Sequence, residues 1–214
     1  MATKSRIAES AFRLGVGRYI QEDGAISKLG SEIARLGKCK PFIIGSKTAL
    51  KITKELIEAS LAENGMSGVF YNYEGFCNAD HGDRIINSES FAECDIVIGV
   101  GGGNIMDAAK YCAVKSNKFV INIPTSSATC AAYTPLSVLY NDIGQKVGTA
   151  HHSVEVNAVI VDMEILCKQP VRLLVSGIYD ALAKVPETRQ RILGKSEDEI
   201  DIGLRSSFVL SEFV

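Results

Sequence analysis

The chain has 214 residues, of which 46% are hydrophobic and 22% are charged, a composition typical of a globular protein with one domain and part of another. Its formal net charge is −2 and it has no basic block, which argues against nucleic acid and favours a small molecule as partner. It lacks a signal-peptide pattern and any run of about 18 apolar residues, so we expect no membrane contact and a cytoplasmic location.

Short apolar segments alternate with amphipathic ones through most of the chain. The pattern predicts strands at 41–44, 69–71, 94–100, 119–123 and 158–161, and helices at 47–63, 83–92 and from about 104 to 115. Strands that alternate with helices of this length need crossover connections. The sequence therefore predicts an α/β domain with a mainly parallel sheet covered on both faces.

The sequence pattern changes between the last two predicted strands. Residues 136–140 alternate in polarity and precede the turn sequence Asn141–Gly144, which predicts an antiparallel hairpin at the edge of the parallel sheet. His151 and His152 follow on its far side. Neighbouring residues of an extended strand point to opposite faces, so we expect an exposed pair that does not share a metal ion.

The last part of the chain is predicted to be helical. Pro170 is a suitable first helical residue and is followed by Leu173, Leu174, Ile178 and Leu182 on one broad side. A capping box at 196–199 is expected to open a last helix, with apolar positions Ile200, Leu204, Phe208, Leu210 and Phe213. We expect an α/β domain over 1–165 and the start of an incomplete α-helical domain over 166–214.

The segment VIGVGGGNIMDAAK, residues 97–110, places three glycines between a predicted strand and a predicted helix. Glycines let the main chain approach a ligand closely, and the amino end of a helix attracts a phosphate. As a dinucleotide fingerprint the segment is incomplete, because Asn104 stands where a third glycine is expected. A phosphate cradle and a plain tight turn both fit; three glycines exceed what a turn requires.

Three motifs together carry a family resemblance. GGGNIMDAAK, then IPTSSATCAAYTPLSVLYNDIG, then PVRLLVSGIYDALAK resemble in order and spacing the glycerol dehydrogenase branch of the iron-containing, group III alcohol dehydrogenases. The resemblance implies a Rossmann-like domain that binds NAD(P)(H), followed by an α-helical domain, as in dehydroquinate synthase-like folds. It also implies a divalent metal, zinc or iron, that polarises the substrate oxygen during hydride transfer, and a homo-oligomer.

The resemblance assigns roles residue by residue. Gly101, Gly102, Gly103, Asn104, Ile105 and Asp107 would bind the cofactor pyrophosphate, Thr125 and Ser126 would face the cofactor, and Thr134, Leu136 and Tyr140 would line the nicotinamide side. Asp180 matches the first metal ligand of the family. The two histidines that complete that metal site in the family have no match, because the histidines of this sequence, His81, His151 and His152, all precede Asp180.

Two departures from the family concern specificity. Cys130 stands where glycerol dehydrogenases place a substrate-binding aspartate, which makes glycerol a less suitable substrate and resembles the subgroup that reduces 2-oxo acids. Ser46, followed by Lys47, stands where NAD-selective members place an aspartate against the ribose. A 2′-phosphate could pair with the lysine, so NADPH is an expected cofactor.

The sequence therefore predicts a metal-dependent NAD(P)(H) oxidoreductase that interconverts a small alcohol or 2-hydroxy acid with its carbonyl form. One alternative is a truncated, non-catalytic nucleotide-binding chain, which could dock its open helical face on another subunit. The other is a relative of dehydroquinate synthase or glycerol-1-phosphate dehydrogenase, which share the glycine turn. More basic residues would be expected there than 126–140 contains.

Overall fold

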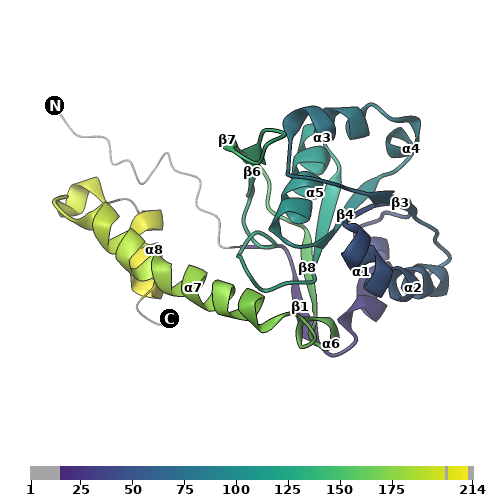
Figure 1. Cartoon of the computed structure of the whole chain (residues 1–214), viewed down its shortest axis with the longest axis horizontal. Coiled ribbons are helices and arrows are strands. Elements are labelled where there is room, and N and C mark those ends of the chain that lie inside the picture. Colours follow the sequence, from purple (N-terminus) through teal and green to yellow (C-terminus); the bar gives the residue numbers. More distant parts are fainter. Residues whose placement is uncertain (1–14, 201, 212–214) are drawn as a thin grey trace.

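A computed structural model describes residues 15–200 and 202–211 of the chain (Figure 1). Its centre is a parallel sheet with the strand order β1-β8-β5-β4-β2-β3. The strands are β1 (Tyr19–Glu22), β2 (Pro41–Gly45), β3 (Val69–Asn72), β4 (Ile96–Gly101), β5 (Phe119–Pro124) and β8 (Ala158–Asp162). The predicted α/β class with a parallel sheet is confirmed.

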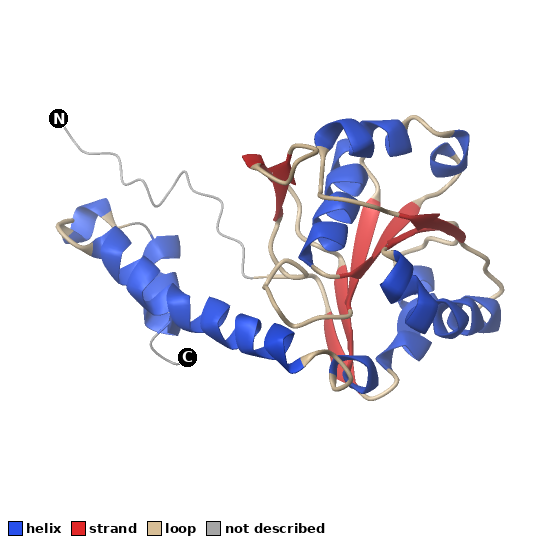
Figure 2. Ribbon diagram, in the orientation of Figure 1, coloured by secondary structure: helices blue, strands red, loops and turns tan. Residues whose placement is uncertain are grey.

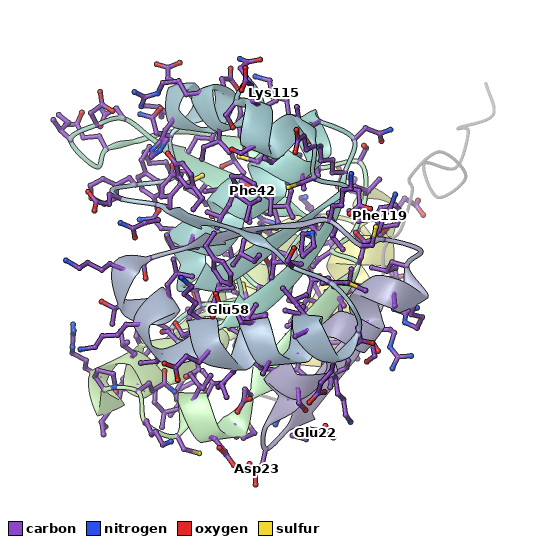
Figure 3. All side chains as sticks on the ribbon, turned by 90° about the vertical axis from the view of Figure 1, so that its right-hand side faces the viewer. Glu22, Asp23, Phe42, Glu58, Lys115 and Phe119 are labelled. Carbon is purple, nitrogen blue, oxygen red and sulfur yellow. The ribbon has the colours of Figure 1, made fainter. Side chains whose placement is uncertain are left out.

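Helices cover both faces of this sheet (Figure 2). One face packs against η2 (Ala25–Lys28), α1 (Leu29–Arg35) and α2 (Lys47–Glu63), and the other against α3 (Ala79–Ile86), α4 (Glu89–Ala92) and α5 (Gly103–Lys115). Successive strand residues serve opposite faces: Phe42 packs toward α5, and Ile43 packs toward α2. Phe42 is buried between the sheet and the layer formed by α3, α4 and α5, whereas Lys115 is at the surface (Figure 3).

The strand order reverses between β2 and β4. From β2 the chain crosses to β3 at one edge of the sheet, and then returns to β4 on the other side of β2. The loops that leave β2 and β4 therefore diverge to opposite faces and open a crevice at the carboxyl ends of these strands. In open α/β sheets ligands bind at such a switch point. The glycine turn follows β4 and Ser46 follows β2, so both lie there.

The predicted hairpin is present as β6 (Leu136–Tyr140) and β7 (Lys146–His151), which pair antiparallel. Its predicted place at the edge of the parallel sheet is wrong. The two strands form a sheet of their own beside α5, because the main-chain N–H of Val138 donates to the Asp107 carboxylate at 3.0 Å. The hairpin is thus bound to a helix of the domain and not to a strand.

Two helices follow the sheet and lie outside its layers (Figure 1). After the short α6 (Met163–Leu166), α7 (Val171–Ile192) runs away from the α/β part, and α8 (Ile202–Ser211) packs beside it. Pro170 is the N-cap of α7 and not its first residue. The capping box at 196–199 exists, but it opens the single 3-10 turn η3 (Glu197–Glu199), and α8 begins later. The predicted apolar position Phe213 lies outside the described residues.

Sequence reasoning missed or merged several elements. It missed β1, whose edge position leaves most of its side chains exposed, and it missed η2 and α1, which are too short to show a periodic pattern. The single helix predicted at 83–92 is wrong: Ser88 is in an extended conformation and separates α3 from α4. Among the described helices, none combines the length and apolar composition that crossing a bilayer requires.

His152 also differs from the expectation of an exposed pair. His151 is exposed, but His152 is buried and its Nε2 lies 2.8 Å from Ser137 Oγ, which donates to the Asp107 carbonyl oxygen at 2.7 Å. Burial, together with the positive charge of Lys110, lowers the pKa of His152 to about 4 from 6.5. The folded protein therefore holds this imidazole in its neutral form.

This shift predicts a stability that depends on pH. Below pH 6.5 His152 is protonated in the unfolded chain but stays neutral in the folded protein, so the free energy of unfolding falls as the pH falls toward 4. Between about pH 7.5 and about pH 5 the decrease is about 2 kcal/mol. Urea unfolding at about pH 7.5 and about pH 5 measures it. His152→Asn should flatten the dependence and His151→Asn should keep it; equal slopes in both variants would contradict the assignment.

Candidate cofactor-binding site

A cleft of about 1560 Å³ lies at the carboxyl ends of β2, β4, β5 and β8. Thirteen of the fourteen residues singled out from the sequence line it; Gly101, buried at the end of β4, does not. The lining residues are Ser46, Gly102, Gly103, Asn104, Ile105, Asp107, Thr125, Ser126, Cys130, Thr134, Leu136, Tyr140 and Asp180. The fold thus brings residues that are up to 134 positions apart (180 − 46) to one place.

The glycine turn forms the floor of this cleft. Gly102 is the N-cap of α5, and the first hydrogen bonds within the helix are donated to its carbonyl oxygen by Ile105 and Met106, at 3.1 and 3.2 Å. The amides of Gly103 and Asn104 precede these bonds and carry the positive end of the helix dipole. A Cβ on Gly102 would point into open space. The turn therefore offers a phosphate a close approach to helix amides.

The side chains of Asn104 and Asp107 are bound within the protein. Asn104 Oδ1 accepts from the amide of Cys77 at 3.1 Å. Asp107 Oδ2 accepts from Val138, and its Oδ1 lies 2.8 Å from Lys110 Nζ. These contacts fix α5 against its neighbours, so the phosphate interaction that we infer rests on main-chain amides.

Ser46 lies at the adenosine end that the resemblance implies. It is the N-cap of α2, and its Oγ accepts from the amide of Ala49 at 3.2 Å. The first turn of α2 contains no acidic residue, and the exposed Lys47 lies in sequence between the cleft-lining residues Ser46 and Thr48. A second phosphate would meet a helix amino end and a nearby cation there, although Asp23 and Glu63 also line the cleft.

Cys130 and Asp180 both line the cleft and lie near enough for the Asp180 charge to act on the thiol. Cys130 is exposed as a residue, but partial desolvation of its thiol raises the pKa; the Asp180 carboxylate raises the pKa further, while Lys184 opposes the shift. Cys130 is therefore a neutral thiol and no activated nucleophile. Asp180 lies 3.8 Å from Lys184 Nζ on the next turn of α7, in a half-exposed ion pair.

Helix α7 is held tightly against the loop that carries Cys130. Gln169 accepts from the amide of Ser127 at 2.9 Å and donates to its hydroxyl at 2.8 Å. A Cβ placed on Gly177 would lie 1.9 Å from the carbonyl oxygen of Ser127. This glycine therefore allows the helix to touch the loop backbone, and Asp180 follows one turn later.

Further cleft residues were missed in the sequence. Ile26 and Ser27 belong to the unpredicted η2, whereas Ile165, Lys168 and Arg172 follow β8. The rule that loops after parallel strands share one edge could have identified the second group. Nothing in the sequence pattern marks the first, because η2 is one turn long.

The residues for a metal site are not assembled in the described part of the chain. Within it, no three His, Cys, Asp or Glu side chains are grouped so that they could hold an ion. His81 stacks on Tyr73 and contacts Tyr71, and His152 contacts Ser137, so neither accompanies Asp180. A zinc or iron site needs at least three protein ligands, so Asp180 as a single ligand does not fit such a metal.

Comparison with known proteins agrees with this architecture. The family model described as "Iron-containing alcohol dehydrogenase" matches residues 17–163. The chain is 33% identical to glycerol dehydrogenase of Escherichia coli O6:H1 over 81% of its own length and 47% of the relative. It is 31% identical to hydroxycarboxylate dehydrogenase A of Escherichia coli K12, over 80% and 46%. The crystal structure of glycerol dehydrogenase from Schizosaccharomyces pombe superposes with a TM-score of 0.77 at 28% identity, over 86% and 47% of the two chains.

A parallel sheet with a glycine turn at its switch point, followed by a long helix, defines a glycerol dehydrogenase-like α/β fold. The chain belongs to the iron-containing alcohol dehydrogenase family, whose members use NAD(H) and a metal ion. It spans less than half the length of the curated relatives named above.

The close approach at Gly177 predicts the sign of the change in the free energy of unfolding for Gly177→Ala. In an exposed helix Gly→Ala stabilises by about 1 kcal/mol. Gly177→Ala should instead destabilise by about 1–3 kcal/mol, because its methyl group meets the Ser127 carbonyl oxygen. Urea unfolding measures the sign, with the exposed neighbour Ser176→Ala as control. A stabilised Gly177→Ala would show that α7 does not touch the loop.

Proposed function

We propose that the chain binds NAD(P)(H) and forms the cofactor part of an oxidoreductase that interconverts a small alcohol or 2-hydroxy acid with its carbonyl form. The observation that carries the proposal is the turn at Gly102–Gly103, whose helix amides face the crevice at the strand switch point. Bound cofactor would supply or accept the hydride, and the turn would hold its pyrophosphate.

The composition of the cleft wall supports a carbonyl substrate beside the nicotinamide. Thr134, Leu136 and Tyr140, which the resemblance places beside the nicotinamide, line the same cleft as Cys130. A neutral thiol at position 130 removes the repulsion that an aspartate would exert on an anionic substrate, and it cannot accept hydrogen bonds from several hydroxyls. We therefore propose a 2-oxo acid or its 2-hydroxy form in preference to glycerol. The 31% identity to hydroxycarboxylate dehydrogenase A supports this choice.

Cofactor binding and turnover make different demands on these residues. The cleft contains the groups that a dinucleotide needs, but Asp180 is not accompanied by a metal-binding set among the described residues. Cofactor binding is accordingly the activity that we propose for the described residues themselves. Turnover of the 2-oxo or 2-hydroxy acid is proposed for the whole protein, as is the homo-oligomer that the resemblance implies.

Filling the open space at Gly102 tests the cradle. Its backbone conformation is extended and a Cβ there contacts nothing within 4 Å, so Gly102→Ala should fold normally and weaken NADPH and NADH binding about tenfold or more by blocking the phosphate. Gly148 on β7 has equally open surroundings. Gly148→Ala is thus the matched control, expected to bind as wild type. Calorimetric titration measures both affinities; unchanged binding by Gly102→Ala would refute the cradle.

The N-cap of α2 tests cofactor preference. Aspartate caps a helix as well as serine does, so Ser46→Asp should preserve the fold. Its carboxylate should repel a 2′-phosphate and accept from a ribose hydroxyl, which shifts the NADPH-to-NADH affinity ratio at least tenfold toward NADH. Asn at the same position caps without charge and serves as the control. Equal ratios in the three proteins would remove Ser46 from the cofactor site.

A further inference from the structure

The loop between β5 and β6 carries much of the cleft wall. Thr125, Ser126, Cys130 and Thr134 all lie on it and line the cleft. A loop of this length that forms no strand or helix of its own loses conformational entropy when it is held in one conformation. Specific contacts must therefore hold it against the domain.

A buried lysine makes the largest set of such contacts. Lys110 on α5 is 1% exposed, and its Nζ donates to the carbonyl oxygens of Ala131 at 2.7 Å and Thr134 at 3.0 Å. It also donates to the carbonyl oxygen of Leu136 and pairs with Asp107 Oδ1 at 2.8 Å. One side chain thus binds three carbonyl groups within six residues of the loop and the strand that follows it.

These contacts require the charged form of the lysine. Burial lowers the pKa of Lys110, and the Asp107 carboxylate opposes that shift. An ammonium group has three hydrogens to share among the four oxygens, whereas a neutral amine would point its lone pair at one of them. The geometry is therefore that of a buried ammonium whose charge is compensated by one carboxylate and three dipoles.

Asn122 holds the loop at a second point, from the sheet. It lies on β5, is fully buried, and its Nδ2 donates to the carbonyl oxygen of Ala132 at 3.0 Å. A Cβ placed on Gly99 would lie 2.7 Å from Asn122 Oδ1, so β4 passes close against this side chain and restricts its rotation. Two core elements, α5 and β5, thus hold consecutive carbonyl groups of the loop.

We propose that Lys110 and Asn122 are positioning residues that fix residues 131–136 before any ligand binds, and so set the wall against which the nicotinamide and substrate lie. Neither residue lines the cleft itself. A wall fixed in advance reduces the ordering cost of binding. The functional part rests on the proposed cofactor binding, whereas the positioning part can be tested without it.

Cys130 serves as a built-in reporter of the loop. It is exposed, as is the distant Cys39, whereas Cys77 and Cys112 are buried in the core. Alkylation by iodoacetamide, followed residue by residue with mass spectrometry, therefore separates loop release from unfolding of the domain. The loss of the Lys110 charge alone would raise the pKa of Cys130 and slow its alkylation, so an increased rate has the opposite sign and reports loosening.

Lys118 provides a matched control. Its Nζ also binds three carbonyl oxygens, those of Phe91, Ala92 and Cys94, but at the end of α4 and not at the cleft. Lys110→Met should raise the Cys130 alkylation rate about fivefold or more, with Cys39, Cys77 and Cys112 unchanged. Lys118→Met should leave the Cys130 rate as in wild type.

Asn122→Ala is the second variant, which changes no charge and should raise the Cys130 rate about threefold. An unchanged or slower Cys130 in both loop variants would overturn the proposal. It would also be overturned if Cys77 and Cys112 gained reactivity together with Cys130 in both, because the contacts would then serve the fold as a whole.

Titration with NADPH and NADH gives the functional arm. Lys110→Met should weaken binding at least tenfold and Lys118→Met should not. If wild type binds neither cofactor, the proposed function fails while the alkylation result still decides the positioning role. Wild-type affinity in Lys110→Met despite faster Cys130 alkylation would overturn the claim that the fixed wall serves the cofactor.

Discussion

The parallel pairing of β2 with β4 is the constraint on which the site depends. Parallel strands must be joined by crossovers, and these bring every strand to the same edge with its carboxyl end. The order reverses at this pair, so the glycine turn and Ser46 leave the sheet in diverging directions. The topology thereby brings together residues of the proposed cofactor site that are widely separated in the sequence.

Buried ionisable groups are handled in a consistent way in the α/β part of the chain. Lys110 is compensated by Asp107 and by main-chain carbonyl groups, and Lys118 uses carbonyl groups at the end of α4. His152 is instead kept neutral beside Ser137. Burying an uncompensated charge is costly, so each of these groups is either paired with oxygen atoms or left uncharged. The contacts of Lys110 and of Ser137 with His152 join α5, the cleft loop and the hairpin.

Much of the α/β part could be predicted from the sequence because its strands are buried on both faces. Residues 96–101 are all buried and form a continuous apolar run, which identifies a central strand without further information. The edge strand β1 has no such run, because most of its side chains are exposed. The break at Ser88 depends on one local conformation, which periodicity over 83–92 does not register.

The candidate site was predictable to a different depth in its two halves. A glycine triplet after a strand has a direct physical meaning, and the family resemblance placed the loop residues and Asp180 beside it. Contacts such as Lys110 with three carbonyl groups, or Asn122 with Ala132, join main chain to side chain across the fold. No spacing rule in a single sequence encodes them. The burial of His152 likewise follows from where the hairpin packs, which its own alternation does not specify.

The absence of a side chain at Gly177 lets the main chain of α7 pack directly on the main chain of the cleft loop. Because the helix backbone rests on the carbonyl of Ser127, there is no intervening layer of side chains to absorb a shift. Gln169, which precedes the N-cap of the helix, makes two hydrogen bonds to the same residue, Ser127. The main chain of α7 and the cleft loop are therefore in direct contact at Gly177, so the position of one restricts the position of the other.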